Sequence, residues 1–455
     1  MSTILVGAEM SIHRYLRASA ARNYQRMSIF GRILPRVRRA LRSMGRCTRG
    51  GIRASVALAA VAGVIWLAGP SSDNTQKDTR GPSDQRAHYV RLTAATHRPF
   101  FRAVYGAYSG TRLPPAREGA RYRVMILTYS DRRVMPRLKA ANPDLRVLMY
   151  VDMMGSDLGD PIGVADWAGY ANATAHHPDW FLRDRNGNQL LFEGYPAGHV
   201  MDVGNRLYQD EGAARVIRVA KAGGFDGVFL DDANASLRWI IPRGAASVAY
   251  PTTQRWQSAV YSFLSNVGPQ LHRAGLLAVA NIGGSTITPG LWQKWNGPID
   301  GAMEESFTNG GVGPDSIANG EWTPKLNHAL WSERNDKISL DHAVTATRAG
   351  ARYALATMLL VARGANLFSA SAGYSREVWW PEYATANSLG RPLGGYRVLR
   401  DGVYRRDFTN GVVLVNPGTR PAIRVRLGAT YSGSGLHKVT AVSLGRTSGV
   451  VLAKS

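Results

Sequence analysis

The sequence predicts an α/β fold, a (β/α)8 TIM barrel followed by a small C-terminal antiparallel β domain. Across residues 96–390, short apolar runs alternate with longer amphipathic stretches. This alternation is typical of parallel strands that are buried on both faces and covered by helices. Seven or eight such units fit a closed barrel better than an open Rossmann-type sheet, since no Gly-rich turn follows any early strand.

The barrel elements can be assigned in order along the chain. The predicted strands are Arg102–Tyr108, Arg123–Tyr129, Arg146–Val151, Phe225–Asp232, Leu276–Asn281, Ile299–Glu305, Lys337–Leu340 and Ala365–Ser369. The predicted helices between them cover residues 132–142, 207–223, 252–273 and 342–363. Pro143 ends the first of these helices, because proline cannot continue the helical hydrogen bonding.

The tail, residues 391–455, begins with a hairpin. Val403–Phe408 and Val412–Asn416 are apolar runs on either side of Asn410-Gly411, and an Asn-Gly pair in this position favours a tight turn. Further runs at Ala422–Leu427 and His437–Leu444 complete the sheet. We expect this β domain to pack against the barrel.

The N-terminal region divides into a basic arm (1–53), an uncharged hydrophobic segment (54–72) and a polar linker (73–95). As a helix, the hydrophobic segment would approach the ~30 Å thickness of a bilayer core. Positive residues ahead of such a segment hold the N-terminus in the cytoplasm. We therefore expect the rest of the chain to be exported, either membrane-anchored through a signal-anchor transmembrane helix or secreted after cleavage. A start at Met44 would give the shorter lead of an ordinary signal peptide.

The composition narrows the classes of function. Apolar residues are 45% and charged residues 19% of the chain, as in globular proteins. The net charge is +24, but residues 1–53 carry +11 of it, so a nucleic-acid partner is not indicated. The remaining charge would favour approach to an acidic glycan or an anionic surface.

The single Cys47 lies in the arm, which leaves the exported part without disulfides. We expect a monomer without a cofactor.

Two predicted strands share one sequence pattern, an Asp-Gly frame in which an acidic residue lies five positions after the Asp. The two segments are Asp226-Gly-Val-Phe-Leu-Asp231 and Asp300-Gly-Ala-Met-Glu-Glu305. Side chains alternate along a strand, and the active site of a TIM barrel lies at the strands' C-terminal ends. Asp231 and Glu305 should therefore face each other across the barrel mouth. Asp232 and Glu304 are each one residue away and should point to the opposite side. Two carboxyl groups in this relation can cleave a glycosidic bond. We expect Asp231 to be the nucleophile or base and Glu305 the general acid.

Other residues near the predicted strand ends are candidates for binding substrate. Trp239 follows Asp231 closely, and aromatic rings suit the C–H faces of sugars. Tyr374 is one of several further aromatic residues in predicted loops. The full set of predicted substrate-binding residues is Tyr150, Asp152, Asp202, Asp232, Trp239, Asn281 and Glu304.

Two alternatives stay open from the residues alone. Asp231 and Asp232 with Asp152 or Asp202 could bind a divalent cation, but no His lies at ligand spacing, so we predict no metal site. The same barrel could also serve a non-catalytic carbohydrate-binding or surface-polysaccharide assembly protein. The separation between Asp231 and Glu305 discriminates this alternative from hydrolysis.

An ordered set of motifs resembles a known bacterial family. The motifs are His177-Pro-Asp-Trp-Phe-Leu182, Asp184-Arg-Asn-Gly187, Val200-Met-Asp-Val-Gly-Asn205 and Phe225-Asp-Gly-Val-Phe-Leu-Asp-Asp232. Over residues 97–415 the chain resembles hypothetical glycosyl hydrolase family fifteen, TIM-barrel proteins similar to the alpha-galactosidase-like superfamily. The resemblance implies a glycosidase with Asp231 as nucleophile and with Glu305, the acid followed by Ser-Phe, as its partner. Together with the predicted export, we expect a polysaccharide substrate outside the cytoplasmic membrane.

Overall fold

The computed structural model describes residues 99–104, 115–158, 165–193, 195–309, 317, 319–374 and 378–455. The predicted arm, hydrophobic segment and linker lie outside these residues. Among the helices within them, none combines the length and apolar character needed to cross a bilayer.

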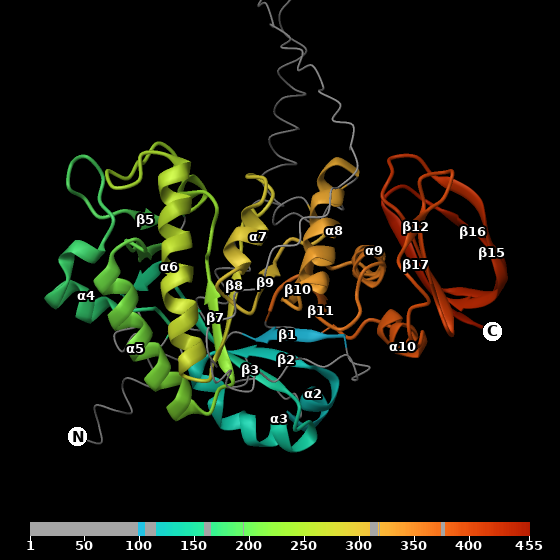
Figure 1. Ribbon diagram of the computed structural model, residues 1–455, viewed down its shortest axis with the longest axis horizontal. Helices are drawn as coiled ribbons and strands as arrows, with labels where there is room; N and C mark the ends of the chain where they lie inside the picture. The colour runs from blue at the N-terminus through green and yellow to red at the C-terminus, as the bar shows by residue number, and fades with distance from the viewer. Residues whose placement is uncertain are drawn as a thin grey trace, which may run out of the picture. The chain divides into compact units, whose positions relative to one another are not determined.

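Eight parallel strands form the barrel, in the order β1-β2-β3-β7-β8-β9-β10-β11 (Figure 1). A parallel bridge between Phe100 and Phe368 joins the last strand to the first. The strands are β1 (Phe101–Val104), β2 (Val124–Leu127), β3 (Arg146–Asp152), β7 (Gly227–Asp231), β8 (Leu277–Asn281), β9 (Gly301–Glu304), β10 (Ile338–Val344) and β11 (Asn366–Ser371). The predicted fold class is confirmed, and each predicted strand overlaps an observed one.

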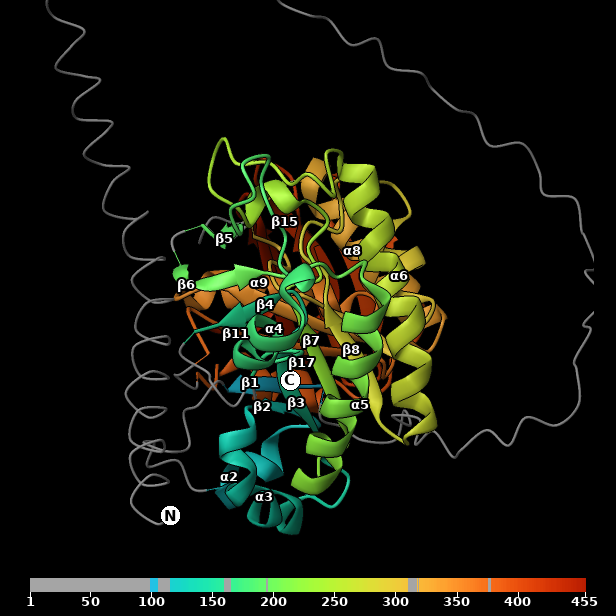
Figure 2. The ribbon, with the colours of Figure 1, turned by 90° about the vertical axis from the view of Figure 1, so that its left-hand side faces the viewer.

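Helices follow the strands on the outside of the barrel. Both views show α5 and α6 side by side (Figure 2). The helices are α2 (Pro115–Arg121), α3 (Met135–Ala141), α5 (Arg206–Gly223), α6 (Thr253–Arg273), α7 (Leu291–Asn296), α8 (Asn319–Arg334), α9 (Arg348–Leu359) and α10 (Glu382–Ser388).

The predicted helix over residues 342–363 begins too early. His342, Ala343 and Val344 continue β10, where they pair with Ser369, Ala370 and Ser371 of β11. Helix α9 starts only after Thr347, whose side chain accepts a hydrogen bond from the Gly350 amide at 3.1 Å. Strand β10 is buried along its whole length although it contains Ser339, Asp341 and His342, so its sequence does not mark where the strand ends and the helix begins.

Each barrel strand is buried on both faces. Inward-facing side chains such as Leu148, Phe229 and Met303 form one apolar cluster inside the barrel. Their neighbours, such as Val228 and Ala302, belong to a second cluster beneath the helices. Alternation along the strand therefore decides whether a residue faces the barrel interior or the helices.

The two Asp-Gly frames have the same structural role. Asp226 accepts a hydrogen bond from the Val147 amide and Asp300 from the Ala278 amide, both at 2.8 Å. Each carboxylate therefore fixes the start of its strand to a neighbouring strand. The glycines permit this close approach: a Cβ at Gly301 would lie 2.1 Å from the Ile338 carbonyl oxygen. The shared frame thus sets which residues reach the mouth.

An insertion between β3 and β7 forms a small sheet that the sequence did not predict. Its antiparallel strands, in the order β4-β6-β5, are β4 (Gly155–Asp157), β6 (Tyr195–Val200) and β5 (Leu191–Phe192). Helix α4 (Tyr170–His176) lies in the same insertion. Strands this short lack a periodic pattern long enough to detect.

The C-terminal domain is a six-stranded antiparallel sheet in the order β12-β13-β14-β17-β15-β16. Its strands are β12 (Arg397–Val398), β13 (Tyr404–Phe408), β14 (Gly411–Asn416), β15 (Ala422–Gly433), β16 (Leu436–Leu444) and β17 (Ser448–Lys454). The predicted hairpin is β13–β14, whereas β17 was not predicted. One face of the sheet joins the barrel-side core through Phe408, Val413 and Val451, and α9 packs on β14 and β17.

Arg406 of β13 links the β domain to the barrel. Its side chain is only 1% exposed, and it donates to the carbonyl oxygens of Leu359, Ala362 and Gly394 at 2.8–3.0 Å. Arg406→Ala would leave these oxygens without a donor, so we expect the free energy of unfolding to fall by about 3 kcal/mol. Chemical denaturation measures this change. The exposed Arg446→Ala is the control, and equal stability of the two variants would contradict the assigned role.

Candidate active site

A group of polar side chains lies inside the barrel at the C-terminal ends of four strands. Tyr150 and Asp152 come from β3, Asp231 from β7 and Asn281 from β8, while Glu305 directly follows β9. The β3–β7 register places Asp152 opposite Asp231. These positions continue the inward-facing rows of the strands, so the apolar interior of the barrel ends in a layer of carboxyl and amide groups.

The Asn281 amide nitrogen joins two of the carboxylates. Nδ2 donates to Asp231 Oδ1 at 2.9 Å and to Glu305 Oε2 at 3.0 Å. Those two oxygens therefore lie no more than 5.9 Å apart, the sum of the two bonds. The orientation of the amide follows from charge, because the reversed amide would place Oδ1 against both carboxylates.

Asp231 is surrounded by hydrogen-bond donors. Besides Asn281, the Asp232 amide donates to its Oδ1 at 3.0 Å, and Tyr150 donates from its hydroxyl. Burial raises the pKa of Asp231, and these three donors act in the opposite direction because they stabilise the ionised form.

Glu305 has fewer donors and a charged neighbour. Burial and then the charge of Asp231 raise its pKa, while hydrogen bonds from Tyr374 and Asn281 lower it. The Tyr374 hydroxyl donates to Oε1 at 2.6 Å. The Tyr374 ring lies 5.0 Å from that of His342, an inward-facing residue of β10 whose pKa burial lowers to about 3. His342 is therefore neutral at physiological pH and supports Tyr374 from below without adding a charge.

Asp152 and Asp232 add two further carboxyl groups to the site. Burial and then the charge of Asp231 raise the pKa of Asp152 to about 7. The pKa of Asp232 is raised well above its ordinary value by burial, with Asp231, Asp152 and Glu305 adding to the effect. Carboxyl groups this close cannot all ionise, so the cluster holds protons at neutral pH.

The residues after β7 turn sharply at the mouth. Asp232 has φ +64°, and Asn234 Nδ2 donates to Asp232 Oδ1 at 2.8 Å. The following loop brings Trp239 over Gly284, where a Cβ would lie 2.0 Å from the indole ring. The Trp239 side chain is 55% exposed. An exposed ring in a loop after β7 suits contact with a sugar.

Glu304 faces the opposite way from Glu305. It lies beneath the helices, where Lys325 donates to Oε1 at 3.1 Å and Ser285 to Oε2 at 2.6 Å, with His328 Nδ1 3.5 Å from Oε2. Glu304 is buried, yet the Lys325 cation, the His328 side chain and the Ser285 hydroxyl lower its pKa to about 2. The structure therefore places this predicted substrate-binding residue in an ion pair of the barrel wall.

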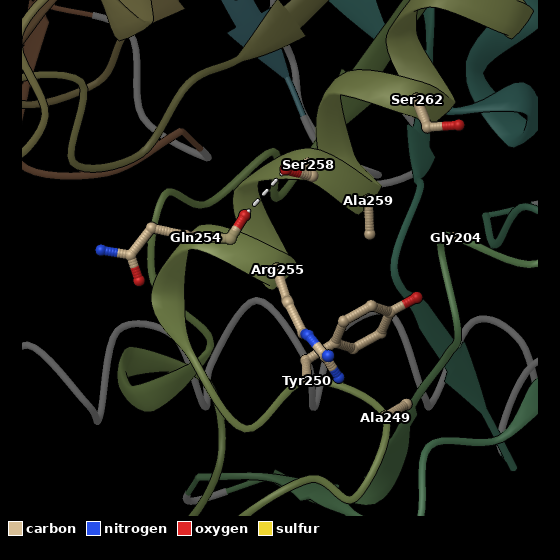
Figure 3. Close-up of a pocket in the computed structure, with 8 residues that line it drawn as sticks. All are labelled: Gly204, Ala249, Tyr250, Gln254, Arg255, Ser258, Ala259 and Ser262. Atoms are coloured by element: carbon tan, nitrogen blue, oxygen red, sulfur yellow. Dashed lines mark hydrogen bonds between the residues drawn. The ribbon is translucent and has the colours of Figure 1, made fainter.

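Asp202 also lies apart from the carboxyl cluster. It accepts hydrogen bonds from the Tyr250 hydroxyl and the Gly204 amide. Tyr250 and Gly204 line a shallow depression of about 420 Å³ at the start of α6, together with Arg255 and Ser258 (Figure 3). The depression contains none of the barrel-mouth carboxylates, and its open shape offers little enclosure for a substrate.

Within the described residues, no three His, Cys, Asp or Glu side chains are arranged to hold a metal ion. The same part of the chain shows no ion pair between Lys or Arg and either Asp231 or Glu305. The two carboxyl groups therefore interact with uncharged donors and with each other, an arrangement that supports proton transfer and attack on carbon.

Residues 139–412, which include β3, β7, β8 and β9, match the family described as Hypothetical glycosyl hydrolase family 15. This match covers more than half of the 455 residues. The chain belongs to Hypothetical glycosyl hydrolase family 15. The resemblance drawn from the sequence motifs is confirmed, and family membership places the chain among the glycosidases. A comparison with curated protein sequences gives no match.

Several solved structures of glycoside hydrolases are similar to this chain at low identity and with TM-scores below 0.5. The glycoside hydrolase domain of PelA from Pseudomonas aeruginosa is 16% identical with a TM-score of 0.40, over 61% of this chain and 96% of that domain. An alpha-amylase from Lactobacillus plantarum is 10% identical with a TM-score of 0.46, over 79% and 99%. The GH36 alpha-galactosidase AgaA from Geobacillus stearothermophilus is 13% identical with a TM-score of 0.42, over 79% and 56%. These likenesses concern the fold alone.

Two site residues had only weak sequence signals. Tyr374 was one of many loop aromatics, and only its place after β11 could have singled it out. Lys325, the partner of Glu304, comes from α8, a helix that the sequence did not predict. Both contacts join residues that are distant in the sequence, at separations of 69 and 21.

The Glu304–Lys325 pair should support stability. The pKa of Glu304 lies near 2 in the folded protein and 4.5 ordinarily, so its contribution is present above pH 4.5 and is lost as the pH falls toward 2. Lys325→Met leaves a buried carboxylate without its main cation, and we expect a loss of about 3–5 kcal/mol at pH 7 by urea denaturation. Adding Glu304→Gln should restore most of that loss. The exposed Lys221→Met is the control, and a similar small effect in both single variants would refute this assignment.

Proposed function

We propose that the protein hydrolyses glycosidic bonds, with Asp231 as nucleophile and Glu305 as general acid and then general base. The observation that carries this proposal is the Asn281 amide, which holds both carboxyl groups at 2.9 and 3.0 Å. A glycosidase needs one ionised and one protonated carboxyl group on either side of the scissile bond.

The surroundings of the two groups support these separate roles. Asp231 accepts from three donors that stabilise its charge, which suits a nucleophile. Burial and then the charge of Asp231 raise the pKa of Glu305, which favours its protonated form. In the first step Asp231 attacks the anomeric carbon while Glu305 protonates the departing oxygen. In the second step Glu305 removes a proton from water as the water oxygen attacks the anomeric carbon, and the bond between that carbon and Asp231 breaks to release the sugar.

The spacing supports a mechanism with retention of anomeric configuration. The two N–H bonds of one amide diverge by about 120°, so the bridged oxygens lie about 5 Å apart, close to the separation typical of retaining glycosidases. An inverting enzyme would need a wider gap, of about 6.5–9.5 Å, to admit water between sugar and base.

The proposed substrate is a polysaccharide outside the cytoplasmic membrane. The hydrophobic segment 54–72 behind an Arg-rich arm supports export, with the chain membrane-anchored or secreted, and we propose that it acts there as a monomer. Trp239 and the hydroxyl of Tyr150 would contact the sugar, and Asp152 would accept a sugar hydroxyl.

Asp231→Asn and Glu305→Gln should each lower kcat/KM by roughly 1000-fold, because each removes a proton-transfer or nucleophilic group from the reaction. A panel of aryl glycosides and glycans measures the rates. Azide should rescue Asp231→Ala and yield a glycosyl azide of opposite anomeric configuration, since it attacks from the face that the carboxylate leaves. Asp202→Asn, a carboxylate outside the cluster, is the matched control. Full activity of both active-site variants would rule out the proposed mechanism.

Tyr374→Phe should move the alkaline limb of the pH–rate profile to higher pH. The Tyr374 hydroxyl stabilises the ionised form of Glu305, so its loss raises the pKa of that carboxyl group. A general acid must be protonated, and a higher pKa therefore extends activity upward in pH. Tyr195→Phe, in the inserted sheet, is the control. An alkaline limb that moves down or stays in place would contradict the assignment of Glu305 as the acid.

A further inference from the structure

Positive charge is concentrated in the β domain and not in the barrel. Residues 391–455 contain eleven Lys and Arg against two Asp and Glu, whereas residues 96–390 contain 29 against 26. After Asp407 the chain has no acidic residue at all.

The structure shows which of these charges are available. Arg406 is buried against the barrel, and Asp407 is paired with Arg397 and Arg405. Arg405 also donates to the backbone carbonyl of Leu427 at 2.7 Å, so its charge is used inside the domain. The one other acid of the domain, Asp401, lies in an exposed turn between β12 and β13.

Arg424 and Arg426 are exposed on β15, and Arg420 and Arg446 are exposed just before the start of β15 and just after the end of β16 (Figure 1). We call these four arginines the basic face. No ion pair involves any of the four within the described part of the chain. Arg424 and Arg426 are two residues apart on β15, and like charges without a counter-charge repel each other, so an anionic ligand would relieve their repulsion.

The local backbone keeps these side chains together and exposed. Asn416 Nδ2 donates to the carbonyl oxygens of Arg420 and Gly445, each at 2.8 Å, and so holds the start of β15 beside the end of β16. A bulge follows, in which Arg424 has φ +53° and its amide donates to Ser443 Oγ at 3.1 Å. Bulges re-aim side chains, and here Arg424 is turned out to solvent while Val425 stays buried.

We propose that the basic face is a binding site for an acidic polysaccharide, one that carries carboxylate or phosphate groups along its length. All four side chains are Arg, whose planar guanidinium pairs with carboxylate or phosphate through two parallel hydrogen bonds. The identification of the ligand as a glycan rests on the proposed function of the barrel. The β domain would hold the polymer near the protein and raise its effective concentration at the barrel mouth.

The basic face differs from a single-strand nucleic-acid site and from a membrane-inserting surface. Proteins that bind single strands stack bases on exposed aromatic rings, but Phe408 and Tyr431, the aromatic residues after Asp407, are only 5% and 4% exposed. Insertion into a bilayer requires a row of apolar side chains, and in β15 and β16 the large exposed one is Ile423 alone.

Binding of alginate, a linear polyuronate, to full-length Asp231→Asn protein tests the proposal at low and high salt. We expect Arg424→Ala/Arg426→Ala/Arg446→Ala on this background to weaken alginate binding by about tenfold at low salt. Arg117→Ala/Arg137→Ala/Arg273→Ala removes the same charge from exposed barrel positions and should change the affinity by less than about twofold. Neutral dextran should bind to none of the proteins.

Several results would overturn the proposal: an equal loss in both triple variants, no binding of alginate, or tighter Arg-dependent binding of duplex DNA or of phosphatidylglycerol–phosphatidylcholine vesicles. In the catalytically intact chain, the β-domain variant should keep the wild-type rate on small neutral aryl glycosides, and a lower rate would contradict the separation of the two sites. If the wild-type chain cleaves no glycan but binds alginate through these arginines, the proposed function fails and the polyanion site stands.

Discussion

The Asn281 side-chain amide is the contact on which the rest of the site depends. It donates to Asp231 and Glu305 at once, and so holds together two groups that would repel each other if both were ionised. Burial adds to this constraint, because a carboxylate away from water requires donors or a shared proton. The surrounding donors are distributed unequally, with Tyr150 and the Asp232 amide on one carboxylate and Tyr374 on the other. This unequal distribution of donors supports the separate roles proposed for the two groups.

A one-residue step along β9 separates chemistry from stability. Glu305 faces the mouth, whereas Glu304 faces α8 and pairs with Lys325. The pKa of Glu304 falls to about 2 beside that cation, while the pKa of Glu305 is raised by burial and by the charge of Asp231. Strand alternation thus places one of two adjacent glutamates in an ion pair of the barrel wall and the other, the proposed general acid, at the mouth. The Asp-Gly frame determines which glutamate faces the mouth, because Asp300 accepts a hydrogen bond from the Ala278 amide and so fixes the start of β9.

The β domain shows a similar division between packing and exposed charge. One face of its sheet supplies Val413, Val451 and the buried Arg406 to the contact with α9. The outer strands carry arginines that the few acids of the domain do not neutralise. The buried hydrogen bonds of Arg406 would hold the β domain, and with it this charged surface, in a fixed position on the barrel.

The sequence by itself determined the barrel, the hairpin and the pairing of Asp231 with Glu305. Each of these follows from local signals: buried strands read as continuous apolar runs, Asn-Gly reads as a turn, and residues at equal distance from an Asp-Gly pair share a facing. Only the tertiary structure decided the partners of those residues. Tyr374 meets Glu305, Lys325 meets Glu304 and Tyr250 meets Asp202 through the closure of the barrel and its insertion. Such contacts depend on how distant segments pack, and no periodicity along the chain encodes them. For the same physical reason, Asp202 and Glu304 looked like site residues in the sequence, while the fold places their carboxylates against other partners.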